Sequence, residues 1–243
     1  AMFTLAKDAE EQGEYAARTA LKILDGMVPS QIPVVTNRKA QLTVNLDMAK
    51  ALDVVFPLSV LKVATVIGSR PGGSGSGQDW PAGYDFSQKR VAWVDSYHAG
   101  YEWSDGIETA IRKEFYGTGI KLDVIRMDTK NKSEAEMIRA SARRAKVRLD
   151  RFNPDLIIAS DDNAQKFLIV PHYRNTATPV VFCGVNEDAA GYGYPAENIT
   201  GMIEVSPILE LVDLLRPWTT GNRIAFLSGN TASPRIVVKN YNS

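Results

Sequence analysis

The chain has 243 residues, 28 basic and 28 acidic side chains, and a hydrophobic share of 44%. This composition is typical of a globular protein and excludes a disordered chain. The neutral balance disfavours nucleic-acid binding, because such proteins need a basic face to neutralise phosphates. With one cysteine and two histidines, a disulfide framework, a multi-cysteine metal site and a histidine-rich metal centre are excluded.

The first 67 residues predict short elements. Ala16, Ala20, Ile23 and Leu24 recur at helical spacing, which predicts a helix over 8–25 that Gly26 ends. After it we expect two short strands and then two helical turns, at 33–35, 42–44, 47–52 and 58–64. No strand is expected before the helix, so this segment resembles the end of a domain placed first.

A Gly-Ser tract follows, running from Ser69 to Gly77. Such tracts behave as flexible coil and contain no side chain that could pack. The unmixed repeat favours an engineered linker over about 68–78. A natural interdomain linker is the alternative interpretation.

Beyond the tract, apolar runs alternate with amphipathic helical patterns. The predicted strands cover 90–95, 122–127, 156–159, 179–183, 200–203 and 223–228. The predicted helices cover about 104–116, 133–152, a segment after 161–163, and 206–217. This alternation predicts an α/β fold with a doubly wound, mostly parallel sheet. The nearly unbroken apolar strands agree, because such strands are buried on both faces.

Three helix starts carry cap signals. Ser133 with Glu136 predicts a capping box, and Ser206 before Pro207 predicts a capped start with proline at the first helical position. Asp161 to Asn163 are good N-cap residues for the helix that follows.

Signatures of catalysis are absent from the sequence. There is no phosphate-binding GxxxxGK[ST] loop, no GxSxG elbow and no HExxH. The stretch 191–196 imitates a dinucleotide fingerprint but does not lead from a strand into a helix. Cys183 with His98 or His172 could form a nucleophile and base, but Cys183 lies in an apolar strand, where cysteines are usually inert. We therefore expect no enzyme, no cofactor and no metal.

Polar and aromatic residues follow the predicted strands at their carboxyl ends. Ligands bind at this edge in open parallel sheets. The candidate ligand-binding residues are Tyr97, His98, Tyr101, Trp103, Asp161, Asp162, Asn163, Asn186, Glu187, Glu204 and Ser228.

This mixture of groups suits a small organic ligand with a planar or apolar body and a few polar handles. Carboxylates and aromatic rings favour an ammonium or several hydroxyls on the ligand, and helix N-termini also allow a zwitterion. Structural roles are the alternative: Asp161, Asn163 and Ser206 as caps, Tyr97, Tyr101 and Trp103 as a packed loop, and Glu187 with Asp188 as solvated charges.

The chain resembles the solute-binding proteins of bacterial ABC importers, in the group that includes tryptophan-binding members. In the long part, the resembling stretches are 91–94 with 97–103, 154–159, 179–182, and 198–202 with Pro207. In the first part they are 13–20, 23–26, 29–34 and 42–46, with Ala49 and Leu52. The resemblance implies a two-lobed periplasmic-binding-protein fold of type I.

Family members carry the segment that resembles 1–67 at their end, so the resemblance implies a circular permutation. It implies one lobe of 79–205 plus about 1–30. The hinge crossing and a partial second lobe would take about 31–67 plus 206–243. Members have further βαβ units after the strand matching 224–227, so the second lobe is expected to be incomplete.

The resemblance also implies what the protein does. A ligand, amino-acid-like or an amine, would enter the cleft between two lobes, the lobes would close, and a membrane ABC permease would receive the closed form. The natural parent would be periplasmic or lipid-anchored, and this sequence opens without a signal peptide. The alternative is an engineered sensor, because residues 240–243 resemble part of a fluorescent-protein strand where reporters are fused.

Overall fold

The computed structural model describes residues 3–51, 53–56, 58–62, 64–67, 85–186 and 189–216. These residues form two compact units. The larger unit takes 9–37 and 85–205, and the smaller takes 3–8, 38–67 and 206–216 within the described ranges. The chain therefore passes from one unit to the other after residues 8, 37 and 205.

The larger unit is built on a six-stranded sheet in which every pairing is parallel. In spatial order the strands are β2 (Val35–Thr36), β9 (Ile199–Ile203), β8 (Val180–Val185), β7 (Leu156–Ser160), β5 (Arg90–Asp95) and β6 (Lys121–Arg126). β7 and β8 are buried along their whole length, as strands covered on both faces should be. The predicted doubly wound α/β class is confirmed.

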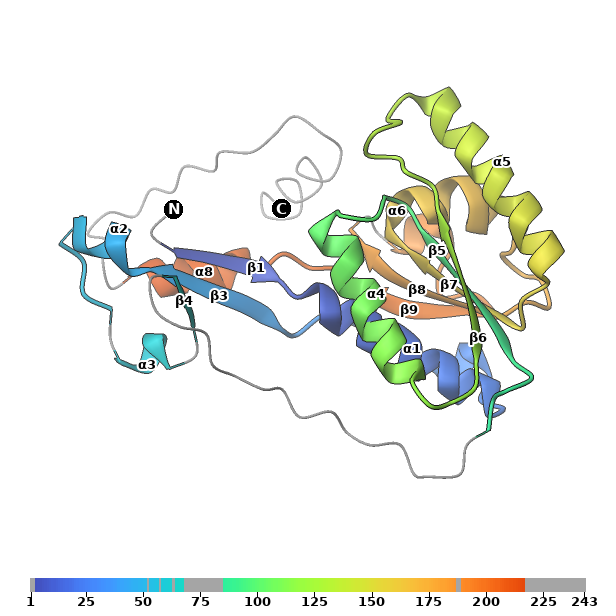
Figure 1. Cartoon of the computed structure of the whole chain (residues 1–243), viewed down its shortest axis with the longest axis horizontal. Coiled ribbons are helices and arrows are strands. Elements are labelled where there is room, and N and C mark those ends of the chain that lie inside the picture. Colours follow the sequence, from blue (N-terminus) through green and yellow to red (C-terminus); the bar gives the residue numbers. More distant parts are fainter. Residues whose placement is uncertain are drawn as a thin grey trace. The chain divides into compact units, whose positions relative to one another are not determined.

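Helices cover both faces of this sheet (Figure 1). One face carries α1 (Ala9–Leu24) and α4 (Glu102–Phe115), and the other carries α5 (Ala135–Phe152) with the π-helical turn η2 (Gln165–Ile169). The remaining helical elements of this unit are η1 (Pro29–Gln31), α6 (Asp161–Ala164), α7 (Val170–His172) and η3 (Ala189–Tyr192). Ala142, Ala145 and Leu149 from α5 pack against alternate residues of β5, such as Ala92 and Val94.

Helices α1 and α4 approach each other unusually closely. A Cβ added at Gly13 would lie 2.4 Å from the backbone oxygen of Ile107, and one at Gly106 would lie 2.8 Å from the Cβ of Ala9. Only glycine at these positions allows the two backbones to come so near.

The smaller unit contains a three-stranded sheet. β1 (Phe3–Lys7) pairs antiparallel with β3 (Ala40–Asn45), and β3 pairs parallel with β4 (Thr65–Ile67). Helices α2 (Leu46–Ala51), α3 (Leu58–Leu61) and α8 (Ile208–Leu215) belong to this unit as well. Its small core consists of Val44, Ala49 and Phe56.

Most predicted elements of the larger unit are present with shifts of one to three residues at their ends. The expectation of no opening strand was wrong, because β1 precedes α1 and finds its partner β3 more than thirty residues away. The predicted turn over 58–64 stops at Leu61, and strand β4 follows it. The predicted strand 223–228 and the Gly-Ser tract lie outside the described residues.

The predicted helix caps were wrong. α5 begins after Glu134 rather than Ser133, and α8 begins after Pro207, each without a capping hydrogen bond from a side chain. α6 starts at Asp161 itself after Ser160, so Asp161 to Asn163 lie inside its first turn. Among the described helices, none is both long and apolar enough to span a bilayer.

The division of the larger and smaller units also differs from the predicted lobes at two places. Residues 3–8 lie in the smaller unit, and residues 31–37 lie in the larger one, where β2 pairs with β9. That these units are the lobes of a binding protein stays a prediction.

Candidate functional site

The candidate site lies where the order of the strands in the sheet reverses. β5 pairs with β6 on one side and with β7 on the other. After β5 the chain forms β6 on one side of β5, and it then crosses over to form β7 on the other side. Ligands of open α/β sheets bind in the crevice outside the carboxyl ends of the strands at such a point. The segments after β5 and β7 carry seven of the eleven predicted ligand-binding residues.

Asp161 follows β7 and is 1% exposed. Its Oδ1 accepts a hydrogen bond of 3.0 Å from the indole N–H of Trp103, whereas its Oδ2 is buried without a partner. Burial raises the pKa of the Asp161 carboxyl well above its usual range, and the charges of Asp95 and Asp162 raise it further. The Trp103 hydrogen bond and the nearby charge of Lys130 lower this pKa only in part.

Gln12 is a second buried side chain with an unpartnered atom, and it is bonded to Gly184. The Oε1 of Gln12 accepts a 2.9 Å hydrogen bond from the Gly184 N–H, and its buried Nε2 has no partner. A Cβ at Gly184 would lie 3.1 Å from Asp161 Oδ1 and 3.4 Å from Trp103 Nε1. Gly184, with a φ of +67°, thus contacts two polar side chains that each have an unpartnered buried atom.

The segment after β5 presents an aromatic pair. The rings of Tyr97 and Tyr101 meet edge to face with centroids 5.2 Å apart, and His98 lies 5.9 Å from Tyr101. The ammonium of Lys130 lies 4.4 Å and 4.8 Å from the centroids of Tyr97 and Tyr101. The faces of these two rings can therefore bind a cation through cation–π attraction.

Asp162, Asn186 and Glu204 form a separate polar cluster at the ends of β7, β8 and β9. Asp162 accepts hydrogen bonds from the Asn186 N–H at 3.2 Å and the Tyr192 hydroxyl at 3.1 Å. The side-chain amide of Asn186 donates to Glu204 at 3.0 Å. These bonds join the loops after β7, β8 and β9. The polar groups that were predicted to bind a ligand are thus already hydrogen-bonded within the protein.

Asn163 contributes to the same edge in a structural way. Its amide donates to Thr129 Oγ1 at 2.8 Å, and the Thr129 hydroxyl donates to the backbone oxygen of Ser96 at 2.8 Å. The Ser96 hydroxyl in turn donates to the backbone oxygen of Ser160 and accepts from the Ala164 N–H. The loops after β5, β6 and β7 are thus fixed to one another.

The buried carboxyl of Asp95 stabilises the loop at this edge of the sheet. Asp95, the last residue of β5, accepts hydrogen bonds from the Tyr97 N–H at 3.0 Å and the Ser104 hydroxyl at 2.9 Å, and it pairs with Arg126. Burial raises the pKa of Asp95, while these donors lower it in part. Arg126 also pairs with Glu108, so β5, β6 and α4 are joined by charge.

Ten of the eleven predicted ligand-binding residues follow, in the sequence, a strand of the six-stranded sheet. Nine of these ten are among the residues that the structure describes. The structure brings together Trp103 with Asp161, Tyr97 with His98 and Tyr101, and Asp162 with Asn186 and Glu204. Glu187 and Ser228 lie outside the described residues. That any of these residues binds a ligand stays a prediction.

Sequence reasoning missed Gln12 and Lys130. Gln12 sits on an amphipathic helix far from the other residues in sequence, and no local pattern marks it. Lys130 follows β6, and the loop after this strand could have been considered together with the other carboxyl-end loops. Burial raises the pKa of the Cys183 thiol well above its usual range, which gives no support to a nucleophilic role.

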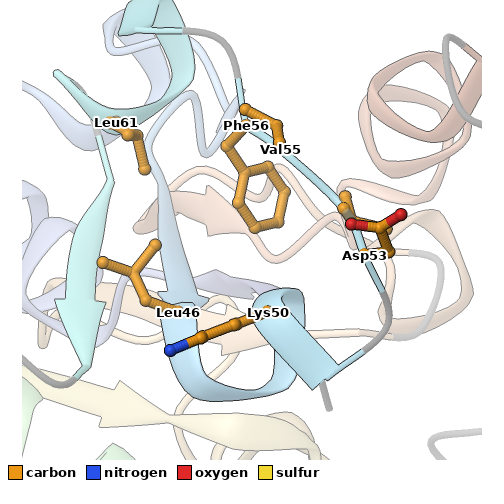
Figure 2. A pocket seen from close by; sticks show the side chains of 7 residues that line it. Leu46, Lys50, Asp53, Val55, Phe56 and Leu61 are labelled. Atoms are coloured by element: carbon orange, nitrogen blue, oxygen red, sulfur yellow. The ribbon is translucent and has the colours of Figure 1, made fainter.

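The smaller unit has a hollow of its own, of about 300 Å³. Figure 2 shows Leu46 and Leu61 pointing toward each other, with the ring of Phe56 beside them and Lys50 and Asp53 at the margin. Its remaining lining comes from Val54 and Val55. The hollow is mostly apolar and contains few of the convergent polar groups that ligand pockets use to fix orientation.

Residues 1–67 match the family described as ABC transporter substrate binding protein. This part of the chain is similar to the substrate-binding proteins of ABC transporters. The predicted resemblance is thereby confirmed at that level. The tryptophan-binding group and the circular permutation stay predictions.

No curated protein matches the chain. Among solved structures, a conserved domain protein from Vibrio cholerae O1 biovar El Tor strain N16961 matches at 19% identity with a TM-score of 0.38. The match covers 53% of this chain and 43% of that protein. At this level the likeness does not extend to function. Among the described residues, no group of three or more His, Cys, Asp or Glu side chains could hold a metal ion.

Proposed function

We propose that this chain is a non-catalytic solute-binding module that takes a small organic ligand carrying an ammonium or a zwitterion. The ligand would bind at the carboxyl ends of β5 and β7 in the larger unit. The family match of residues 1–67 supports the solute-binding role. The reversal of strand order next to β5 supports the place.

The proposed ligand class rests mainly on the state of the Asp161 carboxyl. The carboxyl accepts a hydrogen bond from the Trp103 indole at Oδ1, and its Oδ2 is buried without a partner. Burial raises its pKa, and the charges of Asp95 and Asp162 raise it further. An ammonium that reached Oδ2 would let Asp161 ionise and would form a charge-assisted hydrogen bond. The aromatic pair of Tyr97 and Tyr101 offers a second place for positive charge.

The family also indicates the partner and the compartment. Substrate-binding proteins of ABC importers deliver a ligand to a membrane permease, and they work outside the cytoplasm. We therefore propose a permease as the partner of the natural protein and an extracytoplasmic location for it, on the strength of the match over 1–67.

Calorimetry of the full chain against amino acids, amines, nucleosides and sugars tests this proposal. We expect saturable binding of a cationic or zwitterionic compound, without product formation. Asp161→Asn should weaken that binding by about tenfold or more, because an amide cannot provide the charge that an ammonium needs. Asp150→Asn is the matched control, since Asp150 pairs with Lys146 on the solvent side of α5. Turnover of a compound, or equal affinity in Asp161→Asn and wild type, would contradict the proposal.

We also propose that the chain is circularly permuted relative to its family. β2 comes first in sequence among the six strands, yet it lies at the sheet edge next to β9, which comes last. Counted from β5, and with β2 placed after β9, the spatial order becomes 2-1-3-4-5-6. This regular order supports a parent in which residues 1–67 follow the segment of β5 to β9.

A reordered chain tests the permutation. In it, residues 85–243 come first and residues 1–67 follow through the same Gly-Ser linker. Because a permuted chain keeps the same contacts and changes only which ends are joined, we expect a free energy of unfolding within about 1 kcal/mol of the present chain. An unfolded product would contradict the proposal. The alternative of a fused sensor depends on residues beyond 216, which lie outside the described residues, and it stays a prediction.

A further inference from the structure

A positively charged side chain of the protein itself, Lys130, already lies against the rings of Tyr97 and Tyr101. The Lys130 ammonium lies 4.4 Å from the Tyr97 centroid and 4.8 Å from the Tyr101 centroid. Both distances are inside the roughly 6 Å within which a cation is attracted to a ring face. Lys130 is an exposed residue, so its ammonium is free to exchange this position for water.

The backbone leading to Lys130 is fixed against the loop that carries Tyr97. The Met127 N–H donates to the Asp95 oxygen at 2.8 Å, and the Asp128 N–H donates to the Tyr97 oxygen at 2.8 Å. The Thr129 N–H then donates to the Ser96 oxygen at 2.9 Å. These bonds hold the Lys130 backbone in place, so only the flexible stem of the side chain can move the ammonium away.

We propose that Lys130 occupies, in the ligand-free protein, the position on Tyr97 and Tyr101 that a cationic ligand takes, and that such a ligand must displace it. This inference rests on the proposed function. Two ammonium groups cannot share the same rings, because at such separations like charges repel each other. Lys130 thus acts as an internal competitor that weakens binding of small cations and selects ligands with further contacts.

The first experiment examines the lysine itself. In the full chain labelled with ¹³C-lysine, the Lys130 ε-methylene protons should be shifted upfield by the ring currents of the two tyrosines. The signal is assigned by its loss in Lys130→Arg. Tyr101→Leu should move the signal toward that of the other exposed lysines. A Lys130 signal without an upfield shift in the wild-type chain would overturn the inference.

The second experiment measures competition with tetramethylammonium, which has no hydrogen-bond donor and no carboxylate. Lys130→Met keeps most of the length of the stem and removes the charge, whereas Lys130→Arg keeps the charge and the ring contact. We expect a dissociation constant about two- to fivefold lower in Lys130→Met than in wild type, and little change in Lys130→Arg. The difference should persist in about 1 M NaCl, where the Debye length is about 3 Å and distant repulsion is screened.

The outcomes separate this inference from the proposed function. Equal affinity of Lys130→Met and wild type would overturn the displacement while leaving a cation site in place. Upfield-shifted Lys130 protons that do not move when tetramethylammonium saturates the protein would overturn it as well. Absence of tetramethylammonium binding to every variant would contradict a cation site on these two rings, and with it the displacement, while leaving the proposed contact of an ammonium with Asp161 to be tested by Asp161→Asn.

Discussion

The indole N–H of Trp103 donates to Oδ1 of Asp161 over 3.0 Å and so links the first turn of α4 to the start of α6. This bond is the only one that the described structure gives to a carboxyl that is 1% exposed. Removing the donor would leave both carboxyl oxygens buried without a partner. The link between Trp103 and Asp161 therefore matters for stability as well as for any ligand.

Trp103→Phe should destabilise the protein by about 1–3 kcal/mol, the usual effect of leaving a buried polar group unsatisfied. Chemical unfolding of the full chain measures this difference. Because phenylalanine is also smaller, a double-mutant cycle with Asp161→Ala, which removes the acceptor, is needed to isolate the bond. We expect a coupling energy of at least about 0.5 kcal/mol between the two positions. Strict additivity would show that the hydrogen bond contributes nothing.

Asp161→Asn should change how stability depends on pH. The raised pKa of Asp161 means that the folded chain holds the proton more tightly than the unfolded chain. Stability from this group is therefore present below the unfolded pKa of about 4 and is lost as pH rises toward the folded pKa. Asparagine cannot titrate, so the variant avoids this loss. It also tolerates the left-handed φ of +67° at this position.

Unfolding free energies at pH 4.5 and pH 7 check this expectation. Relative to wild type, Asp161→Asn should gain stability as the pH rises from 4.5 to 7, because only the wild-type carboxyl must lose its proton at a buried position. Asp150→Asn removes a carboxyl from an exposed position and serves as the matched control. A flat difference for Asp161→Asn would mean that the carboxyl titrates alike in both states.

Sequence patterns predicted the larger unit well because its strands are buried on both faces. β5, β7 and β8 are nearly continuous apolar runs, and such runs are readable without knowing their partners. β1 and β4 were missed because each is defined by its pairing with β3 rather than by a local apolar pattern. Short strands of this kind depend on contacts that a single sequence does not display.

The candidate site could be predicted only in part, for a similar reason. The topological rule placed Trp103 and Asp161 at one edge, and their direct bond agrees with that placement. The left-handed φ of Asp161 and the bonds that occupy Asp162 are not visible in the sequence. Lys130 has the pattern of a solvated charge, and only the meeting of the loops after β5 and β6 places it over two rings.

Gly184→Ala should destabilise the protein through both its backbone and its neighbours. The φ of +67° costs an L-residue roughly 1–2 kcal/mol, and the new Cβ would lie 3.1 Å from Asp161 Oδ1. Gly117→Ala is a matched control, because its φ is +75° and nothing lies within 4 Å of the added carbon. Unfolding measurements should show a larger loss for Gly184→Ala. Equal losses of unfolding free energy in the two variants would mean that the residues around Asp161 accommodate the added carbon without destabilising the protein.

Gly13→Ala tests the close approach of α1 and α4. In a helix interior, alanine normally stabilises by about 0.8–1.0 kcal/mol over glycine. Here the added Cβ would lie 2.4 Å from the Ile107 backbone oxygen, so the two helices must separate. We therefore expect a net loss of about 1–3 kcal/mol in unfolding free energy, as overpacking usually costs. Gly191→Ala, with no atom within 4 Å of the added carbon, should be nearly neutral.

Because α1 also carries Gln12, a shift of this helix should weaken the 2.9 Å hydrogen bond that Gln12 accepts from Gly184. Amide hydrogen exchange at Gly184 should therefore speed up in Gly13→Ala and stay unchanged in Gly191→Ala. A stabilised Gly13→Ala chain with unchanged exchange at Gly184 would mean that α1 can move away from α4 freely. In that case α4, which carries Trp103, would not be held in place by its contact with α1.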